Sequence, residues 1–200
     1  KISNKMNLSK NDVLVILPLS ILVILGMIMV ASSSMYVADD IASDPFYFAK
    51  RQIIFVSVGL ITMTIFLLLP SNLLFKTDWI FMLISILLLI ALFIPDVGTS
   101  VNGSIRWIRL GSINIQPSEI CKFSLILYIS GYSVRRMSEI DSLRSFLKPL
   151  ALLFVISILI MGQPDLGSTA IVSLLVVGIL FYAGISFSQL GLLILLIALL

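Results

Sequence analysis

The chain has 200 residues, of which 60% are hydrophobic and 12% are charged, with a mean hydropathy of +1.17. Apolar runs near the length of a membrane helix recur along it, which excludes a soluble globular domain and indicates an all-α polytopic membrane protein. The net charge of +3 does not indicate a nucleic-acid partner, because the basic residues gather at the ends of the apolar runs.

Membrane spans are predicted from the apolar runs in chain order, at about 17 to 25 residues each. The predicted spans are 13–31, 53–69, 79–95, 117–134, 149–163, 167–183 and a last one from about 190. The longer connections are expected at 32–52, 96–116 and 135–148. We expect one integral membrane domain over 1–200, the N-terminal portion of a longer protein, ending within its seventh span.

The distribution of basic residues predicts that the amino end is cytoplasmic. In that orientation the inner side carries Lys1, Lys5, Lys10, Lys76, Arg135, Arg136, Arg144 and Lys148. The outer side carries only Lys50, Arg51, Arg106 and Arg109. An excess of Lys and Arg marks the cytoplasmic side of a membrane protein. We therefore expect 96–116 and 163–167, and any binding or reaction site that they form, on the outer face.

The connection at 98–111 contains several glycines, which let a backbone approach a ligand closely. Arg106 and Arg109 flank Trp107 within it. Two interpretations remain open. The three residues can form an anion site, or they can be an interfacial anchor with an aromatic residue and two arginines at the membrane surface.

Gln116-Pro117-Ser118-Glu119 begins the fourth predicted span, and Lys122 follows on the same helix face. Proline fits the first helical position, and an acid in the first turn complements the helix dipole. A charged side chain at membrane depth costs about 3 kcal/mol on insertion scales, so such groups usually serve a function or have a partner. Lys122 is thus a candidate phosphate ligand held by Glu119, or simply the partner that neutralises it.

A second acid lies between two apolar runs, in Gln163-Pro164-Asp165. A helix break at membrane depth is tolerated only where protein or a water-filled cavity covers it. Asp165 can pair with Lys122 or Arg106, act as a base, bind a cation, or fix helix packing as a buried ion-pair partner. We therefore group Lys122, Arg106, Glu119, Asp165 and Gln163 as candidate substrate-binding residues.

The order of several short motifs resembles that of a known family. They are Ser32-Ser33-Ser34, Asp44-Pro45-Phe46-Tyr47-Phe48-Ala49-Lys50-Arg51-Gln52, Asn102-Gly103-Ser104-Ile105-Arg106-Trp107-Ile108, Gly111, Gln116-Pro117-Ser118-Glu119 with Lys122, Phe146-Leu147-Lys148-Pro149 and Gln163-Pro164-Asp165-Leu166-Gly167-Ser168. With these motifs the chain resembles the shape, elongation, division and sporulation (SEDS) membrane proteins, the FtsW/RodA/SpoVE group. Among them it is most similar to the division-type FtsW members.

The resemblance implies a ten-helix peptidoglycan glycosyltransferase of the bacterial inner membrane, which polymerises lipid II on the outer face during septal cell-wall synthesis. In the family's mechanism a carboxylate deprotonates the acceptor 4-hydroxyl, and undecaprenyl diphosphate leaves with inversion. The family's catalytic Asp corresponds to a position beyond Leu200, so no catalytic residue is assigned within 1–200. The implied partners are lipid II, a class B penicillin-binding protein, other division proteins and membrane lipids.

Cofactor and alternative functions follow from the same residues. One cysteine, Cys121, and no histidine argue against a protein-held metal, so a divalent cation is only a candidate. A lipid II flippase would use the same cavity and cations, whereas a scaffold that recruits a transpeptidase would not need Lys122. An ion-coupled transporter is less favoured, since only Glu119 and Asp165 could carry an ion within the membrane.

Overall fold

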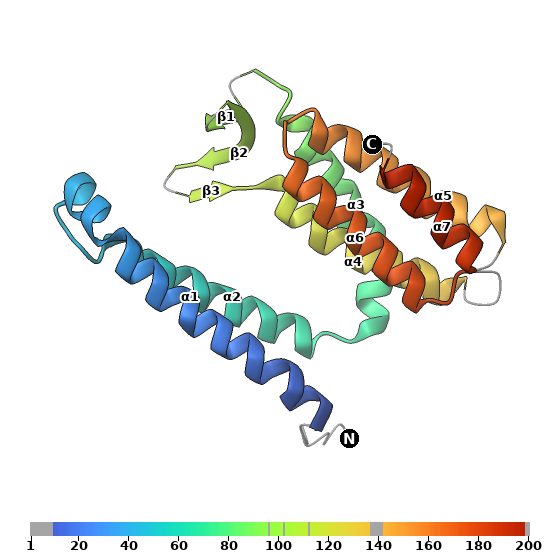
Figure 1. The fold of residues 1–200 in the computed structure, drawn as a ribbon, viewed down its shortest axis with the longest axis horizontal. Coiled ribbons are helices and arrows are strands. Elements are labelled where there is room, and N and C mark those ends of the chain that lie inside the picture. Colours follow the sequence, from blue (N-terminus) through green and yellow to red (C-terminus); the bar gives the residue numbers. More distant parts are fainter. Residues whose placement is uncertain (1–9, 96, 102, 112, 137–141, 199–200) are drawn as a thin grey trace. The chain divides into compact units, whose positions relative to one another are not determined.

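The computed structural model describes residues 10–95, 97–101, 103–111, 113–136 and 142–198. These residues form seven helices and one three-stranded sheet (Figure 1). They divide into two compact units, Lys1–Leu69 and Pro70–Leu200. The predicted helical membrane fold is confirmed, and the division into two units leaves the predicted single membrane domain a prediction.

The first unit is a hairpin of two long helices, α1 (Lys10–Ala42) and α2 (Tyr47–Leu68), which lie side by side (Figure 1). No residue of α2 is buried, as expected for apolar side chains that face lipid. The prediction that the first span ends near residue 31 is wrong, because α1 continues to Ala42. The polar run of serines does not end the helix, since the Ser34 hydroxyl donates to the Val30 carbonyl at 2.6 Å.

The turn between α1 and α2 is organised by Asp44. Its carboxylate accepts hydrogen bonds from the Phe46 amide at 3.0 Å and from the Lys50 ammonium at 2.7 Å. The Arg51 guanidinium lies 5.7 Å from the ring centres of Tyr47 and Phe55. These contacts explain why α2 begins at Tyr47, six residues before the predicted span, since they support a helical first turn.

We expect the Asp44 turn to respond to acid. The hydrogen bond from Lys50, and next the one from the Phe46 amide, lower the pKa of Asp44 below its ordinary value of 3.8. Stabilisation from the ionised carboxylate is then complete above that value and is lost as the pH falls through the lowered pKa. Lys50→Gln should raise the pKa of Asp44 toward 3.8, which an NMR titration of the side chain would measure. An unchanged titration would contradict the pairing.

The second unit is a helix bundle with a small sheet at one end. Its helices are α3 (Ser71–Ala91), α4 (Pro117–Arg135), α5 (Leu143–Met161), α6 (Leu166–Tyr182) and α7 (Phe187–Ala198). Helix α4 packs against α3 and α6, and α6 also contacts α5 and α7. Leu125, Ile129, Ile156, Val172 and Val176 are fully buried between them. The bundle core therefore runs along α4 and α6.

Helix boundaries in this unit differ from the predicted spans mainly at their starts. Helix α3 begins at Ser71 instead of 79, and α5 begins at Leu143 within the predicted 135–148 connection. The Ser142 side chain caps α5 by accepting from the Ser145 amide at 3.3 Å. Capping by a polar residue thus accompanies the extension of α5 beyond its apolar run, whereas α3 begins after Pro70 without a side-chain cap.

The segment predicted as a 96–116 loop contains an antiparallel sheet, with strands β1 (Gly98–Val101), β2 (Ser104–Leu110) and β3 (Ile113–Ile115) in the order β1-β2-β3. Gly103 and Gly111 adopt positive φ angles of 79° and 61° at the two turns, which suits glycine. Thr99 pairs with Trp107, and Arg109 pairs with Asn114. The prediction of an irregular loop is wrong in this respect. Arg106 lies at a bulge in β2, because the pairing with β1 passes from Thr99–Trp107 to Ser100–Ile105.

One ion pair ties α3 to α4 far from the sheet. Asp78 Oδ2 lies 2.8 Å from Arg135 Nη1 without a well-aligned hydrogen bond, and the same nitrogen donates to the Phe75 carbonyl at 2.7 Å. The Asp78 side chain is 2% exposed and the Arg135 side chain is 45% exposed. A Cβ on Gly131 would collide with the Asp78 carboxylate. A glycine is therefore required for the two helices to form this pair.

Several described helices can cross a membrane. Val13–Ile41, Tyr47–Leu68 and Ser71–Ala91 are long and apolar enough to do so by length and composition. Ser145–Met161, Leu166–Tyr182 and Phe187–Ile197 are shorter apolar helices. We treat the chain as a multi-pass membrane protein, in agreement with the predicted class.

Candidate functional site

The candidate site is built on Asp165, the residue that precedes α6. Its carboxylate accepts from the Ser168 amide at 3.1 Å through Oδ1 and from the Ser168 hydroxyl at 2.7 Å through Oδ2. The Thr169 hydroxyl donates to the Asp165 carbonyl at 3.0 Å. Asp165 is only 4% exposed. It is thus the N-cap of α6, where the helix dipole favours a negative charge.

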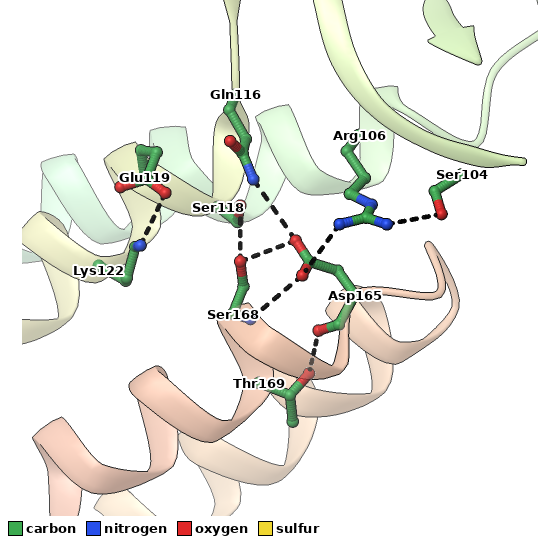
Figure 2. A network of polar contacts seen from close by, with 9 residues as sticks. All are labelled: Ser104, Arg106, Gln116, Ser118, Glu119, Lys122, Asp165, Ser168 and Thr169. Atoms are coloured by element: carbon green, nitrogen blue, oxygen red, sulfur yellow. Dashed lines mark hydrogen bonds and ion pairs between the residues drawn. The ribbon is translucent and has the colours of Figure 1, made fainter. Parts of the chain in front are cut away.

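Asp165 also connects α6 to two other elements. Arg106 Nη1, from β2, lies 3.5 Å from Asp165 Oδ1, and Gln116 Nε2, before α4, lies 3.4 Å from Oδ2 (Figure 2). The same guanidinium donates to the Ser104 hydroxyl at 2.9 Å, and the Ser168 hydroxyl donates to Ser118 at 3.4 Å. The carboxylate therefore joins the sheet, the start of α4 and the start of α6.

Of the two cations predicted as partners of Asp165, Arg106 lies beside it and Lys122 does not. The Arg106 side chain is 35% exposed, whereas that of Asp165 is 6% exposed. The contact of 3.5 Å is long for a charge-assisted hydrogen bond. Because part of the guanidinium reaches the surface and is held only loosely, it can donate to an anion from outside without leaving Asp165.

Lys122 forms a separate pair on α4. Its ammonium lies 2.7 Å from Glu119 Oε1, and in Figure 2 the dashed line joins these two residues only to each other. The Lys122 side chain is 17% exposed, and that of Glu119 is 58% exposed. The predicted pairing of Lys122 with Glu119 is thus observed. The acid at the exposed end draws the ammonium toward the same end of the bundle as Arg106.

Gln163 occupies a different position from the other candidates. It is 3% exposed, and its amide donates to the Leu89 carbonyl at 3.2 Å. That carbonyl belongs to the last turn of α3, where no further helical amide follows to donate a hydrogen bond to it. Gln163 therefore ties the α5–α6 turn to α3. Its predicted contact with a substrate stays a prediction.

A cavity of about 380 Å³ lies beside this turn. Its lining comes from the end of α3, the sheet and the α5–α6 turn, namely Leu92, Phe93, Ile94, Pro95, Gly98, Gly103, Ile105, Gly162, Gln163 and Pro164. A Cβ on Gly162 would approach Phe93 Cζ to 2.9 Å, so this glycine lets the aromatic ring line the cavity. The cavity adds a mostly apolar space next to the charged residues.

Sequence reasoning missed the hydroxyl and amide groups that complete the site. Ser168 and Ser118 were quoted only as parts of motifs, and Gln116 only as the residue before a proline. The Asp165-x-x-Ser168 spacing is the usable signal, since an N-cap side chain bonds the amide three residues on. The pairing of Gln116 with Asp165 spans 49 residues and has no local signal.

We expect Asp165→Ala to damage the site more than Asp165→Asn. Alanine removes the α6 cap, which costs about 1 kcal/mol, and also leaves Arg106 without its acid. Asparagine keeps a cap for Ser168 but loses the charge. Thermal unfolding in detergent should therefore show a larger loss for Asp165→Ala. Equal unfolding midpoints for the two variants would argue against the capping role.

The divalent cation named as a candidate from the sequence stays a prediction. Among the described residues, no group of three or more His, Cys, Asp or Glu could hold a metal ion. Mg²⁺ usually binds through one or two carboxylates together with phosphate groups of a ligand. The partly exposed Glu119 could serve as such a carboxylate, so a divalent cation stays a candidate only when it binds together with an anionic ligand.

The fold and the site define a class of protein: a multi-pass helical membrane protein that gathers charged side chains where two of its helices begin. The family model FTSW_RODA_SPOVE, described as a cell cycle protein, matches residues 12–200. The chain belongs to the FtsW/RodA/SpoVE family, and it is accordingly a multi-pass protein of the bacterial inner membrane. The predicted family is confirmed.

Relatives and solved structures agree with this assignment. The chain is 40% identical over 165 residues to a probable peptidoglycan glycosyltransferase FtsW of Legionella pneumophila, covering 82% of this chain and 42% of that protein. It is 41% identical over 164 residues to its counterpart from Aliivibrio salmonicida, covering 82% and 40%. The chain therefore spans about two fifths of the length of these relatives.

Two solved structures share the fold. The Thermus thermophilus rod shape determining protein RodA matches with a TM-score of 0.64 at 24% identity, covering 88% of this chain and 57% of that one. A chain of a peptidoglycan synthase complex that coordinates polymerization and crosslinking matches with a TM-score of 0.59 at 25% identity, covering 81% and 47%. The helical architecture of this chain thus recurs in both solved structures.

Proposed function

We propose that the protein, extended to the full length of its relatives, polymerises lipid II into glycan strands during septal cell-wall synthesis. The observation that supports this most is the pair of cations, Lys122 and Arg106, each held by an acid at one end of the same bundle. Relatives named probable peptidoglycan glycosyltransferases supply the reaction class. Charged groups at membrane depth are rare, pair with one another and usually mark a functional site.

The proposed chemistry moves negative charge onto a leaving diphosphate. The acceptor sugar's 4-hydroxyl oxygen bonds to the donor's anomeric carbon as the bond from that carbon to the diphosphate oxygen breaks. A carboxylate base takes the hydroxyl proton, and the family resemblance assigns that base beyond Leu200. Fixed cations stabilise the charge that grows on the diphosphate, most strongly where water is excluded.

Each described residue has a distinct role in this proposal. Lys122 and Arg106 donate to the diphosphate, while Glu119 and Asp165 hold their side chains in position. Gln163 keeps the α5–α6 turn against α3, so that Asp165 stays beneath Arg106. A divalent cation on the diphosphate would lower its charge further, with Glu119 as its protein contact.

The cellular setting is part of the same proposal. The excess of basic residues on one side supports a cytoplasmic amino end, and the Asp165 site then faces outward. The structural likeness to a chain of a peptidoglycan synthase complex supports a class B penicillin-binding protein as partner. Similarity to FtsW proteins supports a location at the division septum with other division proteins.

One experiment separates the proposed reaction from its rivals. The full-length protein is purified with its penicillin-binding partner and incubated with lipid II in detergent, and products are separated by gel electrophoresis. Glycan polymer that persists when the partner's own catalytic groups are disabled supports the proposal. Transbilayer movement of lipid II in vesicles without polymer would replace it with a flippase. Activation of the transpeptidase alone would replace it with a scaffold.

A further inference from the structure

Gln116 lies directly before α4 and contacts both acids of the candidate site. Its side-chain amide donates to Asp165 Oδ2 at 3.4 Å, and its backbone carbonyl accepts from the Glu119 amide at 3.1 Å. Figure 2 shows the side chain directed at the Asp165 carboxylate. Each of these acids holds one cation of the site, so a single residue connects the two acid–cation pairs.

Gln116 occupies the N-cap position of α4 but does not cap the helix. Its backbone is extended, with φ −102° and ψ 109°, and its side chain makes no capping hydrogen bond. Serine, threonine, asparagine and aspartate are the usual residues at this position, because their short side chains reach the first free amides. Ser142 before α5 and Asp165 before α6 both follow that rule. The longer side chain of Gln116 instead reaches the start of α6, a contact that capping of α4 does not explain.

The Asp165 carboxylate accepts from four donors, two of them close and two more distant. Each oxygen accepts from one group of Ser168, at 2.7 Å or 3.1 Å. The longer contacts are 3.4 Å from Gln116 to Oδ2 and 3.5 Å from Arg106 to Oδ1. A buried carboxylate that loses one donor is costly unless the remaining donors compensate. Without the Gln116 amide, the Arg106 guanidinium should therefore be drawn toward Asp165 and away from an outside anion.

We propose that Gln116 is a positioning residue that sets the separation of Arg106 and Lys122 to suit the two phosphate groups of a prenyl diphosphate. This inference rests on the proposed function, which assigns both cations to a diphosphate. Gln116 acts on Arg106 through the Asp165 carboxylate. It acts on Lys122 through the first turn of α4, where its carbonyl holds the Glu119 amide. A monophosphate does not need both cations at a fixed separation, so Gln116 should matter mainly for a diphosphate.

The test uses the full-length protein in detergent and two soluble probes, farnesyl diphosphate and farnesyl monophosphate, with binding measured by isothermal titration calorimetry. Wild-type protein should bind the diphosphate more tightly. Gln116→Ser offers a capping hydroxyl to α4 and removes the contact with Asp165, so its unfolding midpoint should not fall below that of wild type. Its diphosphate affinity should nevertheless fall about tenfold, as for one hydrogen bond to a charged group, while its monophosphate affinity stays near wild type.

Two further variants make the result specific. Gln116→Met keeps the length of the side chain without a donor, so it should show the same loss of diphosphate affinity. Asn72→Ser is the matched control, because it exchanges an amide for a hydroxyl at an exposed position in the first turn of α3. Both affinities should stay at the wild-type level in this control. In an Arg106→Gln background, Gln116→Ser should cause a smaller further loss, since part of its effect passes through that cation.

Several results would overturn the assignment of Gln116. They are a wild type that binds both probes equally or binds neither, an unchanged diphosphate affinity in Gln116→Ser and Gln116→Met, and losses that multiply fully in the Arg106→Gln background. Polymer assays with lipid II on the same preparations test the proposed reaction separately. The expected binding pattern in a protein that makes no polymer would support the role of Gln116 and overturn the reaction alone.

Discussion

Replacing Lys122 by alanine in the full-length protein is expected to abolish detectable glycan polymerisation, because the rate should fall about a hundredfold or more. The ammonium is the more buried of the two cations in the site, at 17% side-chain exposure, and its acid Glu119 keeps it near the bundle end. Losing one preorganised group that stabilises developing charge typically costs about 10²–10³ in rate. Polymer yield from lipid II with purified protein is the measurement.

Two comparisons make this result specific. Lys148→Ala removes an exposed lysine from α5 and should leave the polymer yield unchanged. Glu119→Gln keeps a hydrogen-bond acceptor for Lys122 without the charge, so its loss should be smaller. Membrane insertion of all three variants is checked by fractionation. A normal polymer yield from Lys122→Ala would remove the central element of the proposed mechanism.

Replacing Arg135 by glutamine should lower the stability of the bundle by about 2–3 kcal/mol. Removing one partner of a buried ion pair usually costs about 3–5 kcal/mol, because the other charge stays buried alone. The Asp78 side chain is 2% exposed, but Arg135 is 45% exposed, so water reaches the pair and reduces the effect. Unfolding of the purified protein in mixed detergent micelles measures the change.

The double variant Asp78→Asn/Arg135→Gln tests the explanation. It removes both charges, so it should recover most of the stability that Arg135→Gln alone loses. If the double variant is instead less stable than both single variants, the buried charge is not the cause of the loss.

Gly131→Ala provides an independent test of the same contact. The added methyl group would collide with Asp78 and come within 3.1 Å of Arg135 Nη1, so α3 and α4 would have to separate. Gly178→Ala is the matched control on α6, since an added Cβ there meets nothing within 4 Å. Alanine favours helix formation by about 1 kcal/mol over glycine. We therefore expect the control to be neutral or stabilising and Gly131→Ala to be destabilising.

The helical membrane fold follows from the sequence because each span is an apolar run bounded by polar residues. Two helices extend past their predicted spans, and in each of them a serine forms a local hydrogen bond that is compatible with a helix. Ser34 bonds its own helix backbone, and Ser142 caps α5, so α1 and α5 extend past their apolar cores. A hydropathy scale measures the free energy of moving a side chain out of water, so it does not detect these local hydrogen bonds.

The charged members of the site were predictable, whereas their connections were only partly so. Lys122 and Glu119 lie one helical turn apart, so their contact follows from helix geometry. The choice of Arg106 over Lys122 for Asp165 depends on the sheet, whose short strands of four, seven and three residues give little sequence signal. Asp78 went unnoticed because its partner Arg135 is distant in sequence and Gly131 carries no side chain.

The antiparallel sheet has a consequence for how the protein can tolerate insertions. The pairing of β1 with β2 passes from Thr99–Trp107 to Ser100–Ile105, so Arg106 is the extra residue of a β-bulge in β2. One extra residue between Ser104 and Arg106 would shift this bulge along the strand and move the guanidinium away from Asp165. Length changes in this segment of natural variants should therefore fall at the glycine turns, or come in pairs.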